Sequence, residues 1–193
     1  DFAENNNDPN PALGSQDHGT HVAGCASAVT DNGTGVAAPG WKCKILPLKF
    51  SNDNNGSLSG DAAAAIIYAA DMGAALTNNS YGGGGFSNYF LDAFIYAYEL
   101  GTLSITSAGN SDENESFYPA SYHRVLSVAS TASGDYKSGF STYHLSVDIS
   151  SPGSGILSSV PDNDYASFSG TSTITILNSP ISDVFLTCVP PHN

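Results

Sequence analysis

The segment at residues 18–24, His-Gly-Thr-His-Val-Ala-Gly, puts two histidines three residues apart in a run of small residues. A neutral imidazole at His18 could accept a hydroxyl proton and return it to a leaving amine. Far downstream, residues 170–172 read Gly-Thr-Ser, and such a base would activate the hydroxyl of Ser172 as a nucleophile. Between them Asn110 follows a predicted strand, and its amide can donate a hydrogen bond to an oxyanion. Base, amide donor and hydroxyl predict an acyl-transfer site.

Two other chemistries fit these residues less well. His21 could share a metal with His18, but the Glu and the i,i+4 spacing of a metalloprotease motif are absent. We therefore interpret His21 as a structural, hydrogen-bonded histidine. An esterase of the α/β-hydrolase type needs glycines two residues before and after its serine, and that serine precedes the histidine. No serine here has both glycines, and His18 precedes Ser172.

Apolar periodicity predicts an alternation of helices and short strands. We expect helices over residues 22–29, 60–72 (capped by Ser59) and 90–100, and strands over 44–50, 74–80, 103–108 and 125–129. Strands that alternate with helices of this length indicate βαβ units and a mostly parallel sheet. In such sheets the ligand site lies beyond the carboxyl ends of the strands, and Ser80 and Asn110 both fall at such ends.

The same residues resemble the subtilisin-like serine proteases, or subtilases. The family's base motif matches residues 18–24 without a mismatch, and its Ala-Gly-Asn motif matches residues 108–110. Its Gly-Thr-Ser-Met-Ala motif matches only over residues 170–172. Shorter stretches are also similar, at residues 80–83, 118–120, 125–129 and 147–153.

This resemblance, which covers residues 1–172, implies a fold and a domain organisation. The fold would be a three-layer α/β fold, a mostly parallel sheet flanked by helices, subtilisin-like and incomplete at both ends. Residues 1–172 would form a partial peptidase domain, and residues 173–193 an atypical tail that matches nothing in the family.

The resemblance also implies a function. The chain would be part of a serine endopeptidase, an enzyme that hydrolyses peptide bonds through an acyl-enzyme without a cofactor. His18 would be the base, Asn110 the oxyanion donor and Ser172 the nucleophile. The edge at Ser80, Tyr81 and Gly82 would pair with an extended peptide substrate, and the glycines at 82–85 would leave room for a bulky side chain.

Two departures from the family pattern weaken the activity expected of this chain. After Ser172 the sequence continues Thr-Ile-Thr-Ile, which favours a strand over the family's buried helix. The family's Asp-Ser/Thr-Gly motif is absent from residues 1–17, so we nominate no triad aspartate among Asp1, Asp8 and Asp17. We expect the 193-residue chain alone to be inactive. The alternative is a protease-like binding or inhibitory module without catalysis.

Composition limits the partners. A net charge of −13 with only 5 Lys and Arg leaves no basic patch, so we expect no nucleic-acid binding. The sequence has no signal peptide and no apolar run of membrane length, and a targeting segment could have preceded Asp1. We expect a secreted monomer that acts on polypeptides and does not bind membranes.

The cysteines and acidic loops give no assigned metal site. Cys25, Cys43 and Cys188 fit no zinc spacing, and both a Cys25–Cys43 bridge and buried free thiols remain open. Calcium is common in the family, and Asp- and Asn-rich loops could supply oxygens at residues 1–10, 51–61 and 110–115. Solvated loops explain the same composition, so calcium is not assigned.

Overall fold

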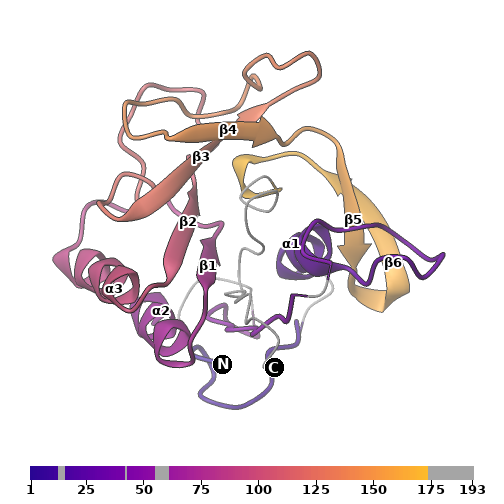
Figure 1. Cartoon of the computed structure of the whole chain (residues 1–193), viewed down its shortest axis with the longest axis horizontal. Helices are drawn as coiled ribbons and strands as arrows, with labels where there is room; N and C mark the ends of the chain where they lie inside the picture. Colours follow the sequence, from indigo (N-terminus) through magenta and orange to yellow (C-terminus); the bar gives the residue numbers. More distant parts are fainter. Residues whose placement is uncertain (13–15, 42, 55–60, 174–193) are drawn as a thin grey trace.

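The computed structural model describes residues 1–12, 16–41, 43–54 and 61–173 (Figure 1). Its helices are α1 (His18–Ser27), α2 (Ala62–Asp71) and α3 (Asn88–Glu99). Its strands are β1 (Leu76–Asn79), β2 (Leu103–Ser107), β3 (Val125–Thr131), β4 (Ile149–Pro152), β5 (Ile156–Val160) and β6 (Asp164–Phe168). Two short 3₁₀ turns complete the order, η1 (Pro161–Asn163) and η2 (Thr171–Thr173).

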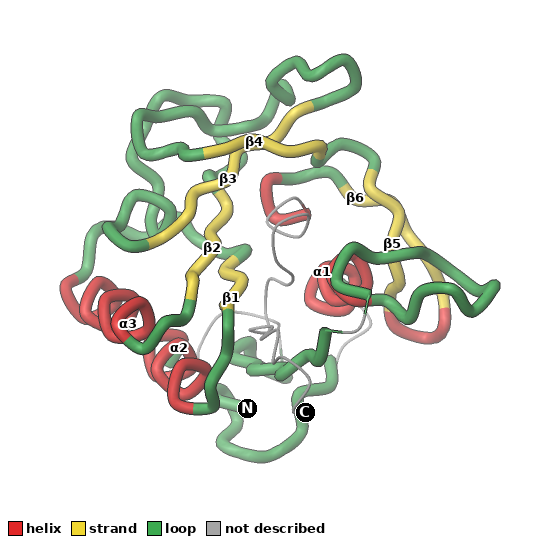
Figure 2. Tube along the Cα trace, viewed as in Figure 1, coloured by secondary structure: helices red, strands yellow, loops and turns green. Residues whose placement is uncertain are grey.

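Strands β1 to β4 form one parallel sheet in the order β1-β2-β3-β4. Helices α2 and α3 lie on one side of this sheet, and α1 lies on the other side beside β5 and β6 (Figures 1 and 2). Strands β5 and β6 pair antiparallel as a separate hairpin, with Ile156 opposite Phe168. The expected three-layer α/β fold is therefore confirmed.

The layer of α2 and α3 is built from small side chains around a few large ones. Ala63, Ala65, Ile66 and Phe94 are fully buried there. Small residues allow the two helices to approach each other and the sheet closely, and burial of their apolar surface stabilises the layer.

The start of α2 differs from the expected one. Ser59 lies outside the described residues, and the carboxylate of Asp61 accepts a hydrogen bond from the Ala64 N–H at 2.9 Å. Asp61 is therefore the N-cap residue, a position that aspartate favours because its oxygen satisfies a free N–H of the first turn.

Three other expectations need correction. Helix α1 begins at His18 and not at residue 22, because the Asp17 carbonyl already accepts a hydrogen bond from the His21 N–H at 2.9 Å. Residues 44–50 contribute single bridge positions in place of a continuous strand. The β5–β6 hairpin was not predicted, although the Pro-Asp-Asn of its turn, residues 161–163, is a recognisable turn signal.

The cysteines differ in state. Cys25 is a free, buried thiol, and burial raises its pKa. Cys43 is disulfide-bonded, so the Cys25–Cys43 bridge is wrong and the free-thiol alternative holds for Cys25 only. Cys188 lies outside the described residues. Within the described ranges, no helix is long and apolar enough to cross a membrane.

Helix α1 packs on β5 at an unusually close approach. Val22, Cys25 and Ala26 form its apolar contact with Ile156. A Cβ atom at Gly24 would lie 2.4 Å from the Ser158 hydroxyl oxygen and 2.2 Å from that of Ser159. The glycine therefore sets how near the helix lies to the hairpin.

We expect Gly24→Ala to destabilise the chain by about 1–3 kcal/mol, because the added methyl group must push α1 away from β5. Gly139→Ala is the matched control, since a Cβ atom there would meet nothing within 4 Å. Its effect should stay within about 1 kcal/mol. Urea unfolding at equilibrium measures both, and equal midpoints for the two variants would contradict the close-packing argument.

Candidate active site

His18, Asn110 and Ser172 line one cavity of about 320 Å³. They come from three different places in the fold, namely the first turn of α1, the turn after β2 and the 3₁₀ turn η2. The rest of the lining comes from the end of β6, the two residues that follow it and the end of η2, namely Ser167, Phe168, Ser169, Gly170 and Thr173. Folding thus brings the three predicted catalytic residues around a shared space.

The side chain of Asn110 is oriented by Thr171. Its Oδ1 atom accepts hydrogen bonds from the Thr171 N–H at 2.9 Å and from the Thr171 hydroxyl at 3.0 Å. Because two donors hold Oδ1, this bond network assigns Nδ2 to the opposite position of the amide. Nδ2 can then donate to a ligand in the cavity, as an oxyanion requires.

The turn that carries Asn110 is held from both sides. The Gly109 N–H donates to the Thr171 hydroxyl at 3.2 Å, and the Gly109 carbonyl accepts from the Thr142 N–H at 2.9 Å. Gly109 has a φ of +106°, and a Cβ atom there would lie 2.8 Å from the Thr142 Oγ1 atom. Only glycine fits this backbone conformation and this space.

Ser172 is joined to the end of β1 by a reciprocal pair of hydrogen bonds. Its hydroxyl donates to the Ser80 carbonyl at 3.2 Å, and the Ser80 hydroxyl donates to the Ser172 carbonyl at 3.0 Å. The nucleophile predicted from the Gly-Thr-Ser motif therefore lies directly beside the first residue of the predicted substrate edge.

The remaining substrate-edge residues pack against aromatic rings. Tyr81 lies edge-on to the Phe50 ring at 5.0 Å, and burial raises the pKa of its hydroxyl, which donates to Asn79 at 3.1 Å. A Cβ atom at Gly82 would lie 2.3 Å from the Phe117 ring. The expectation that all four glycines leave room is wrong at Gly82, where the space is filled.

Beside this edge lies an apolar pocket of about 150 Å³. Nothing lies within 4 Å of a Cβ atom built at Gly84 or Gly85, so these two glycines do leave space. The pocket is lined by Tyr81, Gly82, Gly84, Gly85, Phe90, Tyr118, Pro119 and Tyr122. Aromatic and glycine lining suits an apolar side chain.

Two of the three aspartates that precede His18 in sequence are engaged in local structure. Asp1 accepts hydrogen bonds from two N–H groups of its own turn, at 2.8 and 3.1 Å. Asp8 accepts from the backbone N–H and the side chain of Asn10, at 3.0 and 2.6 Å. The third, Asp17, is the N-cap residue of α1 and makes no side-chain capping bond to that helix.

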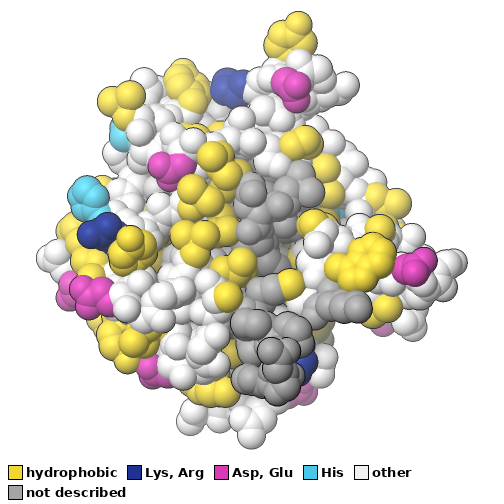
Figure 3. Space-filling view, viewed as in Figure 1, with side chains coloured by type: hydrophobic (Ala, Val, Ile, Leu, Met, Phe, Trp, Pro, Cys, Tyr) yellow, Lys and Arg dark blue, Asp and Glu magenta, His cyan; other side chains and the backbone are white. Residues whose placement is uncertain are grey.

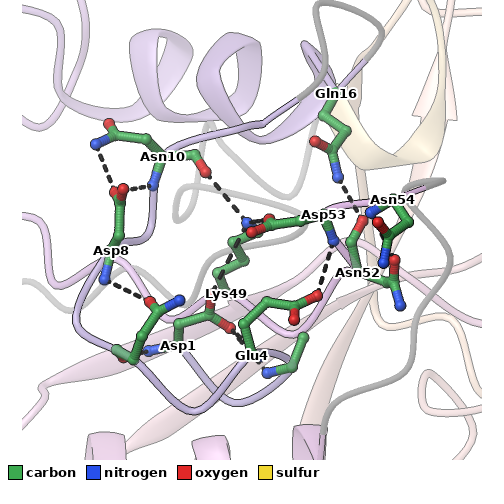
Figure 4. Close-up of polar contacts among 11 residues, drawn as sticks. Asp1, Glu4, Asp8, Asn10, Gln16, Lys49, Asn52, Asp53 and Asn54 are labelled. Carbon is green, nitrogen blue, oxygen red and sulfur yellow. Dashed lines mark hydrogen bonds and ion pairs between the residues drawn. The ribbon is translucent and has the colours of Figure 1, made fainter.

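Oxygens of the N-terminal loop converge on a buried lysine (Figure 4). The Lys49 ammonium is in contact with Asp53, donates to the Asn10 carbonyl at 3.2 Å and lies 3.8 Å from an Asp1 oxygen. Lys49 is only 3% exposed. A buried ammonium needs such partners because desolvation is costly, so Lys49 fastens residues 1–10 to residues 49–53.

The distribution of positive charge on the surface reflects the small number of Lys and Arg residues in the sequence. Lys and Arg side chains are separated from one another on the face shown in Figure 3. Lys137 is also neutralised locally by contact with Asp112.

Comparison with known proteins identifies similar chains. The subtilase family model matches residues 1–175. Thermitase of Thermoactinomyces vulgaris is 43% identical over 176 residues, which cover 91% of this chain and 62% of thermitase. A thermophilic serine proteinase of Bacillus sp. (strain AK1) is 39% identical over 172 residues, which cover 89% of this chain and 42% of that protein. The chain thus spans less than two thirds of the length of these relatives.

Solved structures show the same likeness in three dimensions. A protease from Pseudoalteromonas arctica superimposes with a TM-score of 0.74 at 29% identity, covering 81% of this chain and 54% of that one. The S41 psychrophilic protease gives a TM-score of 0.68 at 30% identity, covering 82% and 59% of the two chains.

We expect Thr171→Val to destabilise the chain by about 1–3 kcal/mol, because it leaves the buried Gly109 N–H and the Asn110 oxygen without a hydroxyl partner. Thr171→Ser keeps the hydroxyl and should cost about 1 kcal/mol or less. Thermal unfolding compares the two. A smaller loss in Thr171→Val than in Thr171→Ser would show that the methyl group of Thr171, and not its hydroxyl, matters at this position.

Proposed function

Because this chain belongs to the subtilase family, we propose that it carries the base, the oxyanion donor and the nucleophile of a serine endopeptidase. One observation carries the proposal: His18, Asn110 and Ser172 line a single cavity although they lie far apart in sequence. The orientation of the Asn110 amide by Thr171 supports the same assignment.

In the proposed reaction the Ser172 oxygen attacks the carbonyl carbon of a peptide bond while the His18 imidazole takes the hydroxyl proton. The carbonyl oxygen becomes an oxyanion, to which the Asn110 Nδ2 donates a hydrogen bond. The C–N bond then breaks, and His18 returns the proton to the leaving amine. Water repeats the sequence on the acyl-enzyme and releases the acid. No step requires a metal or a cofactor.

The proposed substrate is an extended polypeptide. Its main chain would pair with the edge formed by Ser80, Tyr81 and Gly82, because such pairing depends little on side chains. The neighbouring apolar pocket would take one apolar side chain of the substrate. The net charge of −13 would disfavour acidic peptides and nucleic acids.

Secretion and a monomeric state belong to the same proposal. Relatives such as a halolysin-like serine protease of Natrialba magadii are named as extracellular. The net charge of −13 is compatible with a secreted protein, because it favours solubility.

A protease-like binding or inhibitory module without catalysis is the second candidate function. The sequence after Ser172 favours it, because Thr-Ile-Thr-Ile stands where the family's motif continues with Met-Ala. We therefore propose that this chain alone reacts more slowly than thermitase.

A fluorophosphonate reagent tests the assignment. Its phosphorus forms a bond to the attacking serine oxygen as fluoride leaves, so labelling reports an activated serine. We expect slow labelling at Ser172 only, lost in Ser172→Ala and in His18→Ala. Asn110→Ala should slow it further, by at most the 10²–10³-fold known for one oxyanion donor in subtilisin itself.

Matched controls make this outcome decisive. Ser133, which is exposed after β3 and does not line the cavity, supplies the control: Ser133→Ala should label like the unchanged chain. Labelling spread equally over several serines, or absent after long incubation at high reagent concentration, would favour the binding module. Stoichiometric labelling at the rate of thermitase would contradict the expected loss.

A pair of peptidyl phosphonates tests the apolar pocket. The reagent that places a leucine side chain at this pocket should label Ser172 at least about tenfold faster than its glutamate counterpart. Gly85→Val should reduce that preference by filling the space, whereas Gly139→Val, which lies away from the pocket, should not. If the preference for leucine over glutamate persisted in Gly85→Val, the substrate side chain would bind at a place other than this pocket.

A further inference from the structure

His21 joins the two parts of the fold that carry the base and the nucleophile. It lies one helical turn after His18 on α1, and its side chain is fully buried. Its Nε2 atom lies 3.0 Å from the Ile156 carbonyl oxygen and 3.0 Å from the Ala166 carbonyl oxygen. These carbonyls belong to β5 and β6, so a single N–H group spans both strands of the hairpin.

The surroundings of His21 determine its tautomer. Carbonyl oxygens can only accept, so Nε2 must carry the proton. Nδ1 is then the acceptor of the neutral ring, and it faces the Cys25 Sγ atom at 3.7 Å. Both ring nitrogens are therefore satisfied when His21 is neutral with its hydrogen on Nε2. His21 was expected to be a hydrogen-bonded structural histidine, and these contacts show which partner each of its ring nitrogens has.

The contacts of His21 lead directly toward the nucleophile. Its ring stacks on Phe168 with centroids 4.1 Å apart and planes at 13°. Phe168 lines the cavity of His18 and Ser172 and ends the strand that leads into η2. The Ser158 hydroxyl also donates to the His21 carbonyl at 2.6 Å, which fastens the helix to β5 a second time.

We propose that His21 is a positioning residue, which sets the distance between the base on α1 and the nucleophile that follows β6 by holding both hairpin strands through its Nε2–H group. The inference rests on the proposed function. His21 contacts neither the substrate nor the reacting atoms, and it acts through His18 and through the segment of residues 168–172.

The charge state of His21 makes this contact sensitive to pH. Burial lowers its pKa, against the raising effect of the two carbonyls. On its own helix the titratable neighbours are Asp17, His18 and Cys25. The hairpin presents carbonyls, Phe168 and the Ser158 hydroxyl to it, and η2 contributes only hydroxyl side chains.

The two aspartates of the hairpin, Asp162 and Asp164, are exposed at its turn. A pKa depressed below the ordinary 6.5 means that the unfolded chain binds the proton more readily. The stabilisation is complete above pH 6.5 and is lost as the pH falls through the lower, folded-state pKa. Acid should therefore loosen α1 from the hairpin.

Two amide substitutions at His21 distinguish the position of its hydrogen-bond donor from the mere presence of a polar side chain. In His21→Gln the side-chain nitrogen can reach the place of Nε2, whereas in His21→Asn it reaches only that of Nδ1. At pH 8, fluorophosphonate labelling of Ser172 should stay within about threefold in His21→Gln and fall about 10²-fold in His21→Asn, the loss expected of a misplacement near 1 Å.

The pH profile gives a readout that a passive core residue would not move. In the unchanged chain, protonation of His21 should steepen the acidic limb of labelling by one proton. In His21→Gln this additional proton dependence should be absent, because the amide side chain does not titrate. Identical acidic limbs in the two chains would overturn the proposal.

Hydrogen exchange gives a readout independent of reaction. Amides of residues 167–172 should exchange faster in His21→Asn, and at the original rate in His21→Gln, because local opening follows loss of the docking contact. If no chain is labelled, the proposed function fails while this exchange pattern still decides the role of His21. Unchanged exchange in His21→Asn would show that the hairpin needs no such support.

Discussion

The candidate site depends on the hydrogen bonds that the 3₁₀ turn η2 makes to the ends of the strands. Thr171 binds the turn after β2, and Ser172 binds the residue after β1. The Thr173 hydroxyl donates to the Gly170 carbonyl at 2.8 Å and to the Gly153 carbonyl, beyond β4, at 3.3 Å. One short turn thereby ties the ends of three parallel strands to the segment that leaves the hairpin. These hydroxyl contacts fix the position of Ser172 relative to Asn110.

His18 is positioned by a second set of contacts. Helix α1 is docked on the β5–β6 hairpin through Gly24 and His21, and the hairpin continues into η2. The site therefore lies between two parts of the fold, the sheet with α2 and α3 on one side and α1 with its hairpin on the other (Figure 1). The packing of α1 on the hairpin positions His18, and the hydrogen bonds of η2 to the strand ends position Ser172. The placement of His18 relative to Ser172 therefore depends on both contacts.

Much of this geometry is made by hydroxyl and amide groups and very little by charge. In the sheet, the Thr77 hydroxyl donates to that of Ser104 at 3.0 Å, and Asn79 donates to the Ile105 carbonyl at 3.2 Å. Buried neutral groups that find partners cost far less than buried ions. The chain can thus form a specific polar interior with only 12% charged residues. Among the described residues, Lys49 is a buried ion, and it is surrounded by oxygens.

The sequence predicted strands and helices well where the apolar periodicity lies within one continuous segment. The strands ending near Ser80 and Asn110 and the helices now seen as α2 and α3 were recognisable from periodicity alone. The β5–β6 hairpin was missed because its strands are short and partly exposed, with Ser and Tyr in place of a clear apolar alternation. Gly82 was misread because the ring that fills its space, Phe117, lies far along the chain.

The order of amino acids specifies which chemical groups are present, namely an imidazole, an amide, a hydroxyl and the small residues around them, because these are properties of residue type and order. The orientations of these groups are set by contacts that form when the chain folds. The direction of the Asn110 amide depends on Thr171, and the tautomer of His21 depends on two carbonyls more than 130 residues away. Hydrogen-bond partners contributed by distant segments have no local signature, so such orientations appear only once the chain is folded.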